Sequence, residues 1–298
     1  MVDLSIVGIT RSNYANIHNK IELAIERGGG LDLTNGDDVV VKINLCDFRM
    51  PETGAVTHPI FLGATLNYLR STFEDLNIRV VESDATVARP DLLIRWLGFE
   101  PILKRHGAKY VNLTREARAQ ETVKKHINGR YFQEVTVPRV IADSDFLITM
   151  AKLKTALLTN ITCCLKNQFG CLPTPKKSLF HPNLDDVIAD VNLAMKPDYC
   201  IVDGIIGMGG VKGPNLGVPV NSGIVVTGKD PVSVDAVCAR LMGFNPFSIG
   251  HIKKAHASGI GRLSYKVVGE RAPSFKKDFE FNPLYATILR IVNSLNRS

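Results

Sequence analysis

Short β-rich runs alternate with helical patterns in the first third of the chain, and this alternation limits the fold more than any other feature of the sequence. Apolar runs predict strands at residues 4–8, 38–45, 78–82 and 109–113. Apolar residues at helical spacing predict helices at residues 17–27, 58–73 and 90–106, the last interrupted near Gly98. Strands that alternate with helices are typical of a mainly parallel sheet flanked by helices. The predicted fold class is therefore α/β.

The middle of the chain departs from this alternation. Residues 122–127 and 130–137 favour two strands joined by Asn128-Gly129, a pair typical of a two-residue type I′ turn, so a β-hairpin is predicted within residues 120–139. Further strands are expected at residues 146–151, 199–206, 222–227 and 267–268. Further helices are expected at residues 159–169, 184–195, 231–242 and 251–257.

These elements predict one α/β domain over residues 1–270, with two interleaved lobes at residues 1–115 and 140–270 as an open alternative. Residues 271–298 predict a C-terminal amphipathic helix whose apolar face packs on the core or on a second copy of the chain. A homo-oligomer built through this helix is therefore one of the expected states.

Charge is spread unevenly along the chain, whose net charge is +7. Residues 104–139 hold nine Lys or Arg against three Glu, and residues 152–177 hold five Lys and no acidic residue. Such clustering favours an anionic partner, although a solvated basic face explains it equally well. Nucleic acid is the weakest alternative, because no motif of a nucleic-acid-binding module accompanies the charge.

The targeting signals of the sequence are few. Residues 1–7 favour a strand rather than a signal peptide, and no apolar stretch approaches the about 20 residues of a membrane-spanning helix. We therefore expect a cytoplasmic protein without a transmembrane segment.

Candidate site residues gather first at the end of the second predicted strand. Lys42 and Asn44 end that strand, and His58 precedes the next helix. Ligands of open α/β sheets bind beyond the carboxyl ends of the strands, so these three side chains suit a phosphate or carboxylate. A helix cap beside a surface lysine is the alternative.

A second group follows the strand at residues 146–151. Lys152 and Lys154 leave the strand, and a helix at residues 159–169 would point Lys166 and Asn167 toward them. Lysines packed together without an acid lower one another's pKa, so Lys166 is a candidate base or nucleophile. A solvated lysine strip remains the alternative.

A third group lies around the longest Gly/Pro loop. Asp203 ends a predicted strand, and the loop that follows has five glycines among residues 207–217, which permits close approach of the backbone to an anion. The loop glycines expected to bind the ligand are Gly209, Gly210, Gly213 and Gly217. A plain flexible connector is the alternative.

Asp235, His181 and the cysteines complete the candidates. Asp235 lies in an otherwise apolar helix, which makes it a candidate partner for a lysine or histidine and a candidate acid or base alongside Asp203 and His181. Thiolates and imidazoles bind soft metals, but Cys163 and Cys164 are adjacent in a predicted helix and diverge by about 100°. We therefore expect no metal site, and keep Cys163, Cys164 and Cys171 as minor candidates for a metal or an iron–sulfur cluster.

The same residues resemble domain-of-unknown-function family 362. The resemblance rests on K-I-N-L, T-H-P, K-L-K-T, L-K-N-Q-F-G, a lone His, D-G-I, a G-P-N-L-G loop and D-P-V-S-V-D, in the family's order over about residues 38–262. The positions that match the family's motifs are Lys42, Asn44, Thr57, His58, Lys152, Lys154, Thr155, Lys166, Asn167, Gly170, His181, Asp203, Gly204, Gly213, Pro214, Gly217, Asp230 and Asp235.

Two departures from the family pattern matter. Ala156 stands where many members have His, and Ile43 where many have Pro. Many members also carry an appended ferredoxin-like module with iron–sulfur clusters, and the cysteine run of that module is absent from this sequence. The resemblance thus implies the fold and the site, and leaves a ferredoxin-like redox partner as an expectation.

Two functional readings follow. The first is an enzyme that acts on a small anionic substrate in a cleft rich in Lys, His and Gly. A redox-linked reaction is one of the reaction types that this reading allows. The second is a metal- or iron–sulfur-binding factor for electron transfer or maturation.

Overall fold

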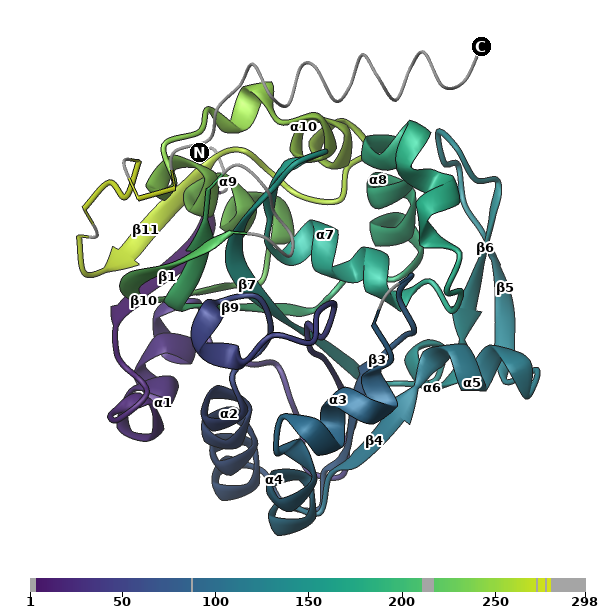
Figure 1. Ribbon diagram of the computed structural model, residues 1–298, viewed down its shortest axis with the longest axis horizontal. Coiled ribbons are helices and arrows are strands. Elements are labelled where there is room, and N and C mark those ends of the chain that lie inside the picture. Colours follow the sequence, from purple (N-terminus) through teal and green to yellow (C-terminus); the bar gives the residue numbers. More distant parts are fainter. Residues whose placement is uncertain (1–3, 87, 211–216, 272, 277, 280–298) are drawn as a thin grey trace.

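The computed structural model describes residues 4–86, 88–210, 217–271, 273–276 and 278–279. Its centre is a nine-stranded sheet in the order β11-β1-β10-β9-β7-β2-β3-β4, with β8 paired to β7 beside this path (Figure 1). The strands of this sheet are β1 (Ser5–Arg11), β2 (Asp38–Lys42), β3 (Asn77–Glu82), β4 (Lys109–Asn112), β7 (Phe146–Ala156), β8 (Asn160–Thr162), β9 (Tyr199–Gly209), β10 (Val218–Gly228) and β11 (Tyr265–Gly269).

Most neighbouring strands run parallel. Strand β2 pairs in parallel with both β3 and β7, while β3 pairs so with β4, and β7 with β9. Strand β10 is antiparallel to β9 and β1, and β11 is parallel to β1 at the sheet edge. The carboxyl ends of β2, β3, β4, β7 and β9 therefore share one edge, and the predicted α/β class is confirmed.

Helices cover both faces of the sheet, as Figure 1 shows with α1 to α4 on one side and α7 to α10 on the other. The helices are α1 (Ile17–Arg27), α2 (Pro59–Thr72), α3 (Pro90–Trp96), α4 (Phe99–Arg105), α5 (Leu113–Arg118), α6 (Arg139–Ala142), α7 (Cys164–Gln168), α8 (Leu184–Ala194), α9 (Pro231–Leu241) and α10 (Gly250–Ala257). Short 3-10 turns are η1 (Pro51–Thr53), η2 (Phe169–Cys171), η3 (Lys177–Asn183) and η4 (Pro246–Ser248).

The sheet separates two apolar cores because successive side chains of a strand point to opposite faces. In β2, Val39 and Val41 pack with α1 to α4, whereas Val40 joins the core of α7 to α10. All three are fully buried, and burial of such a side chain contributes about 1.5–3 kcal/mol.

Local sequence sets two helix boundaries beside the site. Pro59 opens α2, where its missing N–H costs nothing, and His58 Nδ1 accepts the N–H of Ile60 at 3.2 Å as the cap. Gly98, with φ of 76°, separates α3 from α4, so the interruption expected near Gly98 is confirmed.

The helix expected at residues 159–169 is wrong in its first half. Residues Asn160–Thr162 form β8, which turns back antiparallel onto β7, and α7 begins only at Cys164. Asn160 has φ of 65°, which breaks a helix at that point. Strand β7 also runs to Ala156, five residues past its expected end, because β8 supplies its hydrogen bonds.

The hairpin of β5 (Thr122–His126) and β6 (Glu134–Pro138) is present, but its turn differs from the expected one. His126 pairs with Glu134, so seven residues connect the strands, not two. The carboxylate of buried Asp190 accepts the N–H groups of Arg130, Tyr131 and Phe132 at 2.7–2.8 Å. A tertiary contact with α8 thus overrides the local preference of Asn128-Gly129. The predicted C-terminal helix falls mostly on residues 280–298, outside the described residues.

Candidate functional site

The carboxyl ends of β2, β3 and β7 surround a cavity of about 290 Å³. Strands β2 and β7 are neighbours, yet the helices that follow them, α2 and α7, lie on opposite faces of the sheet (Figure 1). Open α/β sheets bind ligands at such a reversal of strand order. The polar residues that line the cavity are Lys42, Asn44, Cys46, Glu82, Ser83, Thr86, Lys154, Thr162, Lys166, Asn167, Lys177 and His181.

Lys42 is fixed at the floor of this cavity, which we call the lysine cavity. Its Nζ lies 2.9 Å from Glu82 Oε1 and donates to the carbonyl of Ile43 at 2.6 Å. A Cβ on Gly170 would lie 2.6 Å from the same Nζ, so only glycine leaves space for the ion pair. Glu82 is the only carboxylate among the described residues that line the cavity.

Lys154 is held from the other side by polar groups without a charge. Its Nζ donates to Asn44 Oδ1 at 2.9 Å, to the carbonyl of Ala55 at 2.7 Å, and to Cys46 Sγ at 3.1 Å. Asn44 in turn donates to Asn167 Oδ1 at 3.0 Å, which joins β2, β7 and α7 in one buried network. Such a network holds the ammonium in a fixed place.

Lys177 closes a third side. Its Nζ donates to Ser83 Oγ, the Asp84 carbonyl and the Thr174 carbonyl at 2.6–2.8 Å. Burial lowers the pKa of Lys177 to about 8, because the charged form has lost its water.

Lys166 differs from the other three lysines. It projects from α7, is half-buried, and forms no hydrogen bond or ion pair with any residue in the described ranges. Burial first, and the neighbouring charge of Lys154 second, lower its pKa to about 8. Lys166 is therefore an unheld amine in a positively charged space.

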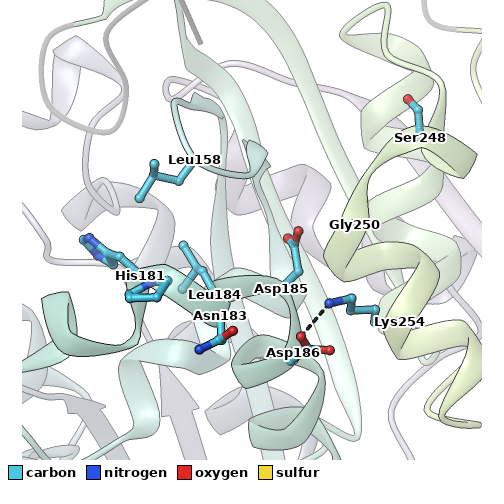
Figure 2. A pocket seen from close by; sticks show the side chains of 10 residues that line it. Leu158, His181, Asn183, Leu184, Asp185, Asp186, Ser248, Gly250 and Lys254 are labelled. Atoms are coloured by element: carbon cyan, nitrogen blue, oxygen red, sulfur yellow. Dashed lines mark ion pairs between the residues drawn. The ribbon is translucent and has the colours of Figure 1, made fainter. Parts of the chain in front are cut away.

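His181 lies at the rim, in η3, with an exposed ring. Burial and the charge of Lys166 both lower its pKa, so the imidazole is neutral near pH 7. His181 also lines a second pocket, of about 480 Å³, where Figure 2 shows it beside Leu158 and opposite the Lys254–Asp186 ion pair of 2.6 Å.

Three residues expected at this site form a neighbouring cluster. Asp203 faces Lys152 across the β7–β9 pairing, and its carboxylate holds the Lys152 Nζ at 2.8 Å. Tyr14 donates to Asp203 at 3.1 Å, and its ring stacks on His58 with centroids 3.8 Å apart. Asp203 thus holds Lys152 on the side of β9. Lys152, Asp203 and His58 are all absent from the described lining of the lysine cavity, contrary to the expectation of one shared cleft.

Asp235 serves a structural purpose. It is fully buried and accepts the N–H groups of Cys164 and Leu165 at 2.7 and 3.0 Å, which anchors the start of α7. Burial raises the pKa of Asp235 to about 6, partly offset by His251. The expected acid or base in the cleft is thus a helix anchor beneath it.

The described glycines of the glycine-rich segment are absent from the lining of the lysine cavity. Gly209 ends β9, and the carbonyl of Gly210 accepts the hydroxyl of Thr155 at 3.0 Å. Gly217 packs against Met208, and its carbonyl accepts from Arg49. Gly213 lies outside the described residues. None of the three described glycines lines the lysine cavity.

The minor metal candidates do not fit a cluster. Cys163 interacts with Cys238, Cys164 with Cys200, and Cys171 donates to Gln168 at 3.3 Å. Burial raises the pKa of Cys163, Cys164 and Cys171, which disfavours the thiolate that a metal binds. Among the described residues, no three His, Cys, Asp or Glu side chains converge on a possible ion site, and no two Cys form a disulfide.

Of the twelve polar residues that line the lysine cavity in the described ranges, the sequence indicated six and gave no assignment for the other six. The predicted ones that the structure brings together are Lys42, Asn44, Lys154, Lys166, Asn167 and His181. The missed ones are Cys46, Glu82, Ser83, Thr86, Thr162 and Lys177. The position of Glu82 at the end of a predicted strand, and of Lys177 in the acid-free lysine segment, were the available signals.

The fold and the cavity define an α/β protein with a small, cationic pocket at the carboxyl edge of its sheet. The chain belongs to the family described as Domain of unknown function (DUF362), whose model matches residues 39–240.

Two known proteins show similarity to the chain. The Thylakoid-associated protein sll1697 of Synechocystis sp. is 28% identical over 134 residues, 41% of each chain, so this chain matches less than half the length of that curated relative. The lactate racemase apoprotein of Thermoanaerobacterium thermosaccharolyticum is 11% identical, with a TM-score of 0.43 over 80% of this chain and 57% of that one. Within the described residues, no helix is both long and apolar enough to span a bilayer.

Proposed function

We propose that this protein is an enzyme that binds a small phosphate- or carboxylate-bearing substrate in the lysine cavity. The observation that supports it is the charge balance: among the described lining residues, Lys42, Lys154, Lys166 and Lys177 face one carboxylate, that of Glu82. Cations gathered in a partly desolvated space repel one another, and a bound anion relieves that repulsion.

Preorganisation supports the same proposal. The ammonium groups of Lys42, Lys154 and Lys177 are each held by two or three fixed acceptors. Little side-chain freedom is therefore lost when an anion binds to them. The volume of about 290 Å³ matches the lower end of the about 300–1,000 Å³ typical of small-molecule sites, which favours a small metabolite.

The roles follow from the geometry. Lys42, Lys154 and Lys177 bind the anionic group. The amide oxygen of Asn44 accepts from Lys154 and that of Asn167 from Lys42, and the two amides are hydrogen-bonded to each other. Lys166 is the base or nucleophile, because it is the lysine whose amine is unheld and whose pKa is lowered to about 8.

His181, at the rim of the cavity, exchanges protons with the substrate and solvent in this proposal. Its imidazole is neutral near pH 7 and faces the charge of Lys166.

The test is the stabilisation of the protein by inorganic phosphate in thermal unfolding. A ligand at 100 times its Kd stabilises the folded state by about 2.7 kcal/mol, so a clear rise in Tm is expected for the wild type. Lys166→Met should unfold at nearly the wild-type temperature without ligand, because Lys166 has no hydrogen-bond or ion-pair partner among the described residues. It should show a much smaller phosphate-induced rise in Tm, because the cavity loses one of its four lysine charges.

The matched control is Lys253→Met, which removes an exposed lysine of α10. This variant should keep the full phosphate response. Equal responses of the wild type and Lys166→Met would contradict the proposal and favour a merely solubilising group of lysines.

A further inference from the structure

We infer that Lys166 is a nucleophile that forms an imine with the carbonyl carbon of a small aldehyde or ketone bearing a carboxylate or phosphate. This inference rests on the proposed function, since it requires the lysine cavity to bind the anionic end of that molecule. It narrows the substrate class from any small anion to an anionic carbonyl compound.

The four lysines of the cavity differ in the acceptors that hold their ammonium groups. The Nζ atoms of Lys42, Lys154 and Lys177 donate to acceptors 2.6–3.1 Å away and are held as cations. Lys166 has no such acceptor in the described ranges. A nucleophile needs a free lone pair and freedom to approach carbon, and Lys166 is the one of the four that has both.

The lowered pKa of Lys166 increases the fraction of its amine that is neutral and can act as a nucleophile. An ordinary lysine, with a pKa of about 10.4, is about 0.4 % neutral at pH 8. Burial and the adjacent charge of Lys154 lower the pKa of Lys166 to about 8, so about half of it is neutral there. Desolvation together with a neighbouring cation is a recognised way to activate a lysine toward carbonyl compounds.

The other lysines of the cavity can hold the anionic end of the carbonyl compound. The positive charge of Lys154 lowers the pKa of Lys166, and the fixed ammonium groups of Lys42 and Lys177 line the same small cavity. A carboxylate or phosphate bound to these cations leaves the rest of a short molecule facing α7, from which Lys166 projects. His181 lines the same cavity as Lys166, which in this proposal lets the imidazole exchange protons with the reacting centre.

The reaction balances without an oxidant or reductant. The neutral amine of Lys166 attacks the carbonyl carbon, a C–N bond forms, and the C=O electron pair moves to oxygen, which takes up a proton. The nitrogen loses one of its own two protons as the carbinolamine forms and the other as the C=N bond forms. Neutral His181 accepts a proton from the nitrogen and passes it to the hydroxyl group, which leaves as water, so both protons of that water come from the amine. The products are one imine and one water.

The test is reductive trapping on the full chain. The protein is incubated with pyruvate or with dihydroxyacetone phosphate, reduced with sodium borohydride, and analysed by intact mass and peptide mapping. One adduct on Lys166 is expected with at least one probe, and inorganic phosphate should reduce its yield by competing for the cavity.

Two variants control the result. Lys166→Arg keeps the positive charge but removes the nucleophile, so it should give no adduct at this position while phosphate still raises its Tm. Lys253→Arg changes an exposed lysine of α10 and should trap as the wild type does. Yield in the wild type should also rise as the pH increases through about 8.

The outcomes separate the two proposals. If phosphate raises the Tm of the wild type but neither probe is trapped at Lys166, the imine is overturned and anion binding stands. Adducts spread over surface lysines, or trapping that phosphate does not reduce, would overturn the imine as well. If Lys166→Arg proves unfolded, two measurements on the wild type still test the imine: the residue to which the adduct maps, and the reduction of adduct yield by phosphate. Absence of both trapping and phosphate stabilisation would overturn the proposed function itself.

Discussion

The ammonium of Lys42 lies 2.9 Å from the carboxylate of Glu82, and both side chains are buried where β2 and β3 end. Removal of one member of a buried ion pair leaves an uncompensated charge and costs about 3–5 kcal/mol. Glu82→Gln should therefore lower the free energy of unfolding by about that amount in urea titrations. Glu100→Gln breaks the exposed pair with Arg95 and should cost less than about 1 kcal/mol. Similar losses for both variants would contradict a buried pair.

Gly170 leaves space for that ion pair. A Cβ there would lie 2.6 Å from Lys42 Nζ and 2.9 Å from Glu82 Oε1, so Gly170→Ala should displace the ammonium and destabilise the protein by about 1–3 kcal/mol. Phosphate-induced stabilisation should fall with it. The matched control is Gly63→Ala in α2, whose Cβ would meet only Ile102 at 3.5 Å and should be neutral or stabilising in the same unfolding measurements. An unchanged phosphate response in Gly170→Ala would refute the role assigned to Lys42.

The buried carboxyl of Asp235 predicts a pH dependence of stability. Burial raises its pKa to about 6 in the folded protein, above the about 3.9 of an unfolded chain. The folded state then binds the proton more tightly, so this contribution to stability is present below about pH 4 and is lost as the pH rises through about 6.

Urea unfolding of the wild type and Asp235→Asn from pH 4 to 7 tests this. The stability advantage of the wild type over the variant should shrink as the pH rises. Exposed Asp143→Asn should show a constant difference from the wild type over the same range. An advantage of the wild type over Asp235→Asn that grows with pH would show that the carboxylate is stabilised in the fold and that the sign is wrong.

The loop between β5 and β6 depends on Asp190, whose carboxylate accepts three backbone N–H groups at 2.7–2.8 Å. Asp190→Ala should therefore speed hydrogen exchange at residues 130–132 much more than in the strands of the main sheet. Asp143→Ala, at an exposed carboxylate near β6, should leave that exchange unchanged. Unaltered exchange in Asp190→Ala would mean that another contact orders the loop.

Local sequence patterns predict the secondary structure correctly where tertiary contacts agree with them. The apolar alternation that assigns β2, and the Pro59 that opens α2, act within a few residues of themselves, so the sequence alone identifies them. The two-residue turn predicted at Asn128-Gly129 is wrong because the carboxylate of Asp190, some sixty residues along the chain, binds the backbone of the loop and overrides the local preference. Strand β8 was not predicted from the sequence because it forms only by pairing with β7.

The site follows the same division. The lysines at residues 42, 154 and 166 follow from strand ends and from the acid-free segment, since strand ends of a parallel sheet meet at one edge. The separation of Lys152 from Lys154 does not follow, because it depends on the register that places Asp203 of β9 opposite Lys152. The ion pair of Glu82 with Lys42 likewise does not follow from the sequence, because it depends on the pairing of β2 with β3.

The most direct test of anion binding in the lysine cavity is the position of an anion in the protein. Crystals of the full chain soaked in sodium selenate would reveal it through the anomalous scattering of selenium. We expect a selenium peak inside the cavity, beside the ammonium groups of Lys42, Lys154 and Lys177, and a much weaker peak in crystals of Lys166→Met, whose cavity has lost one of its four lysine charges. Selenate found only at exposed lysines such as Lys253, with the cavity holding water alone, would contradict the account.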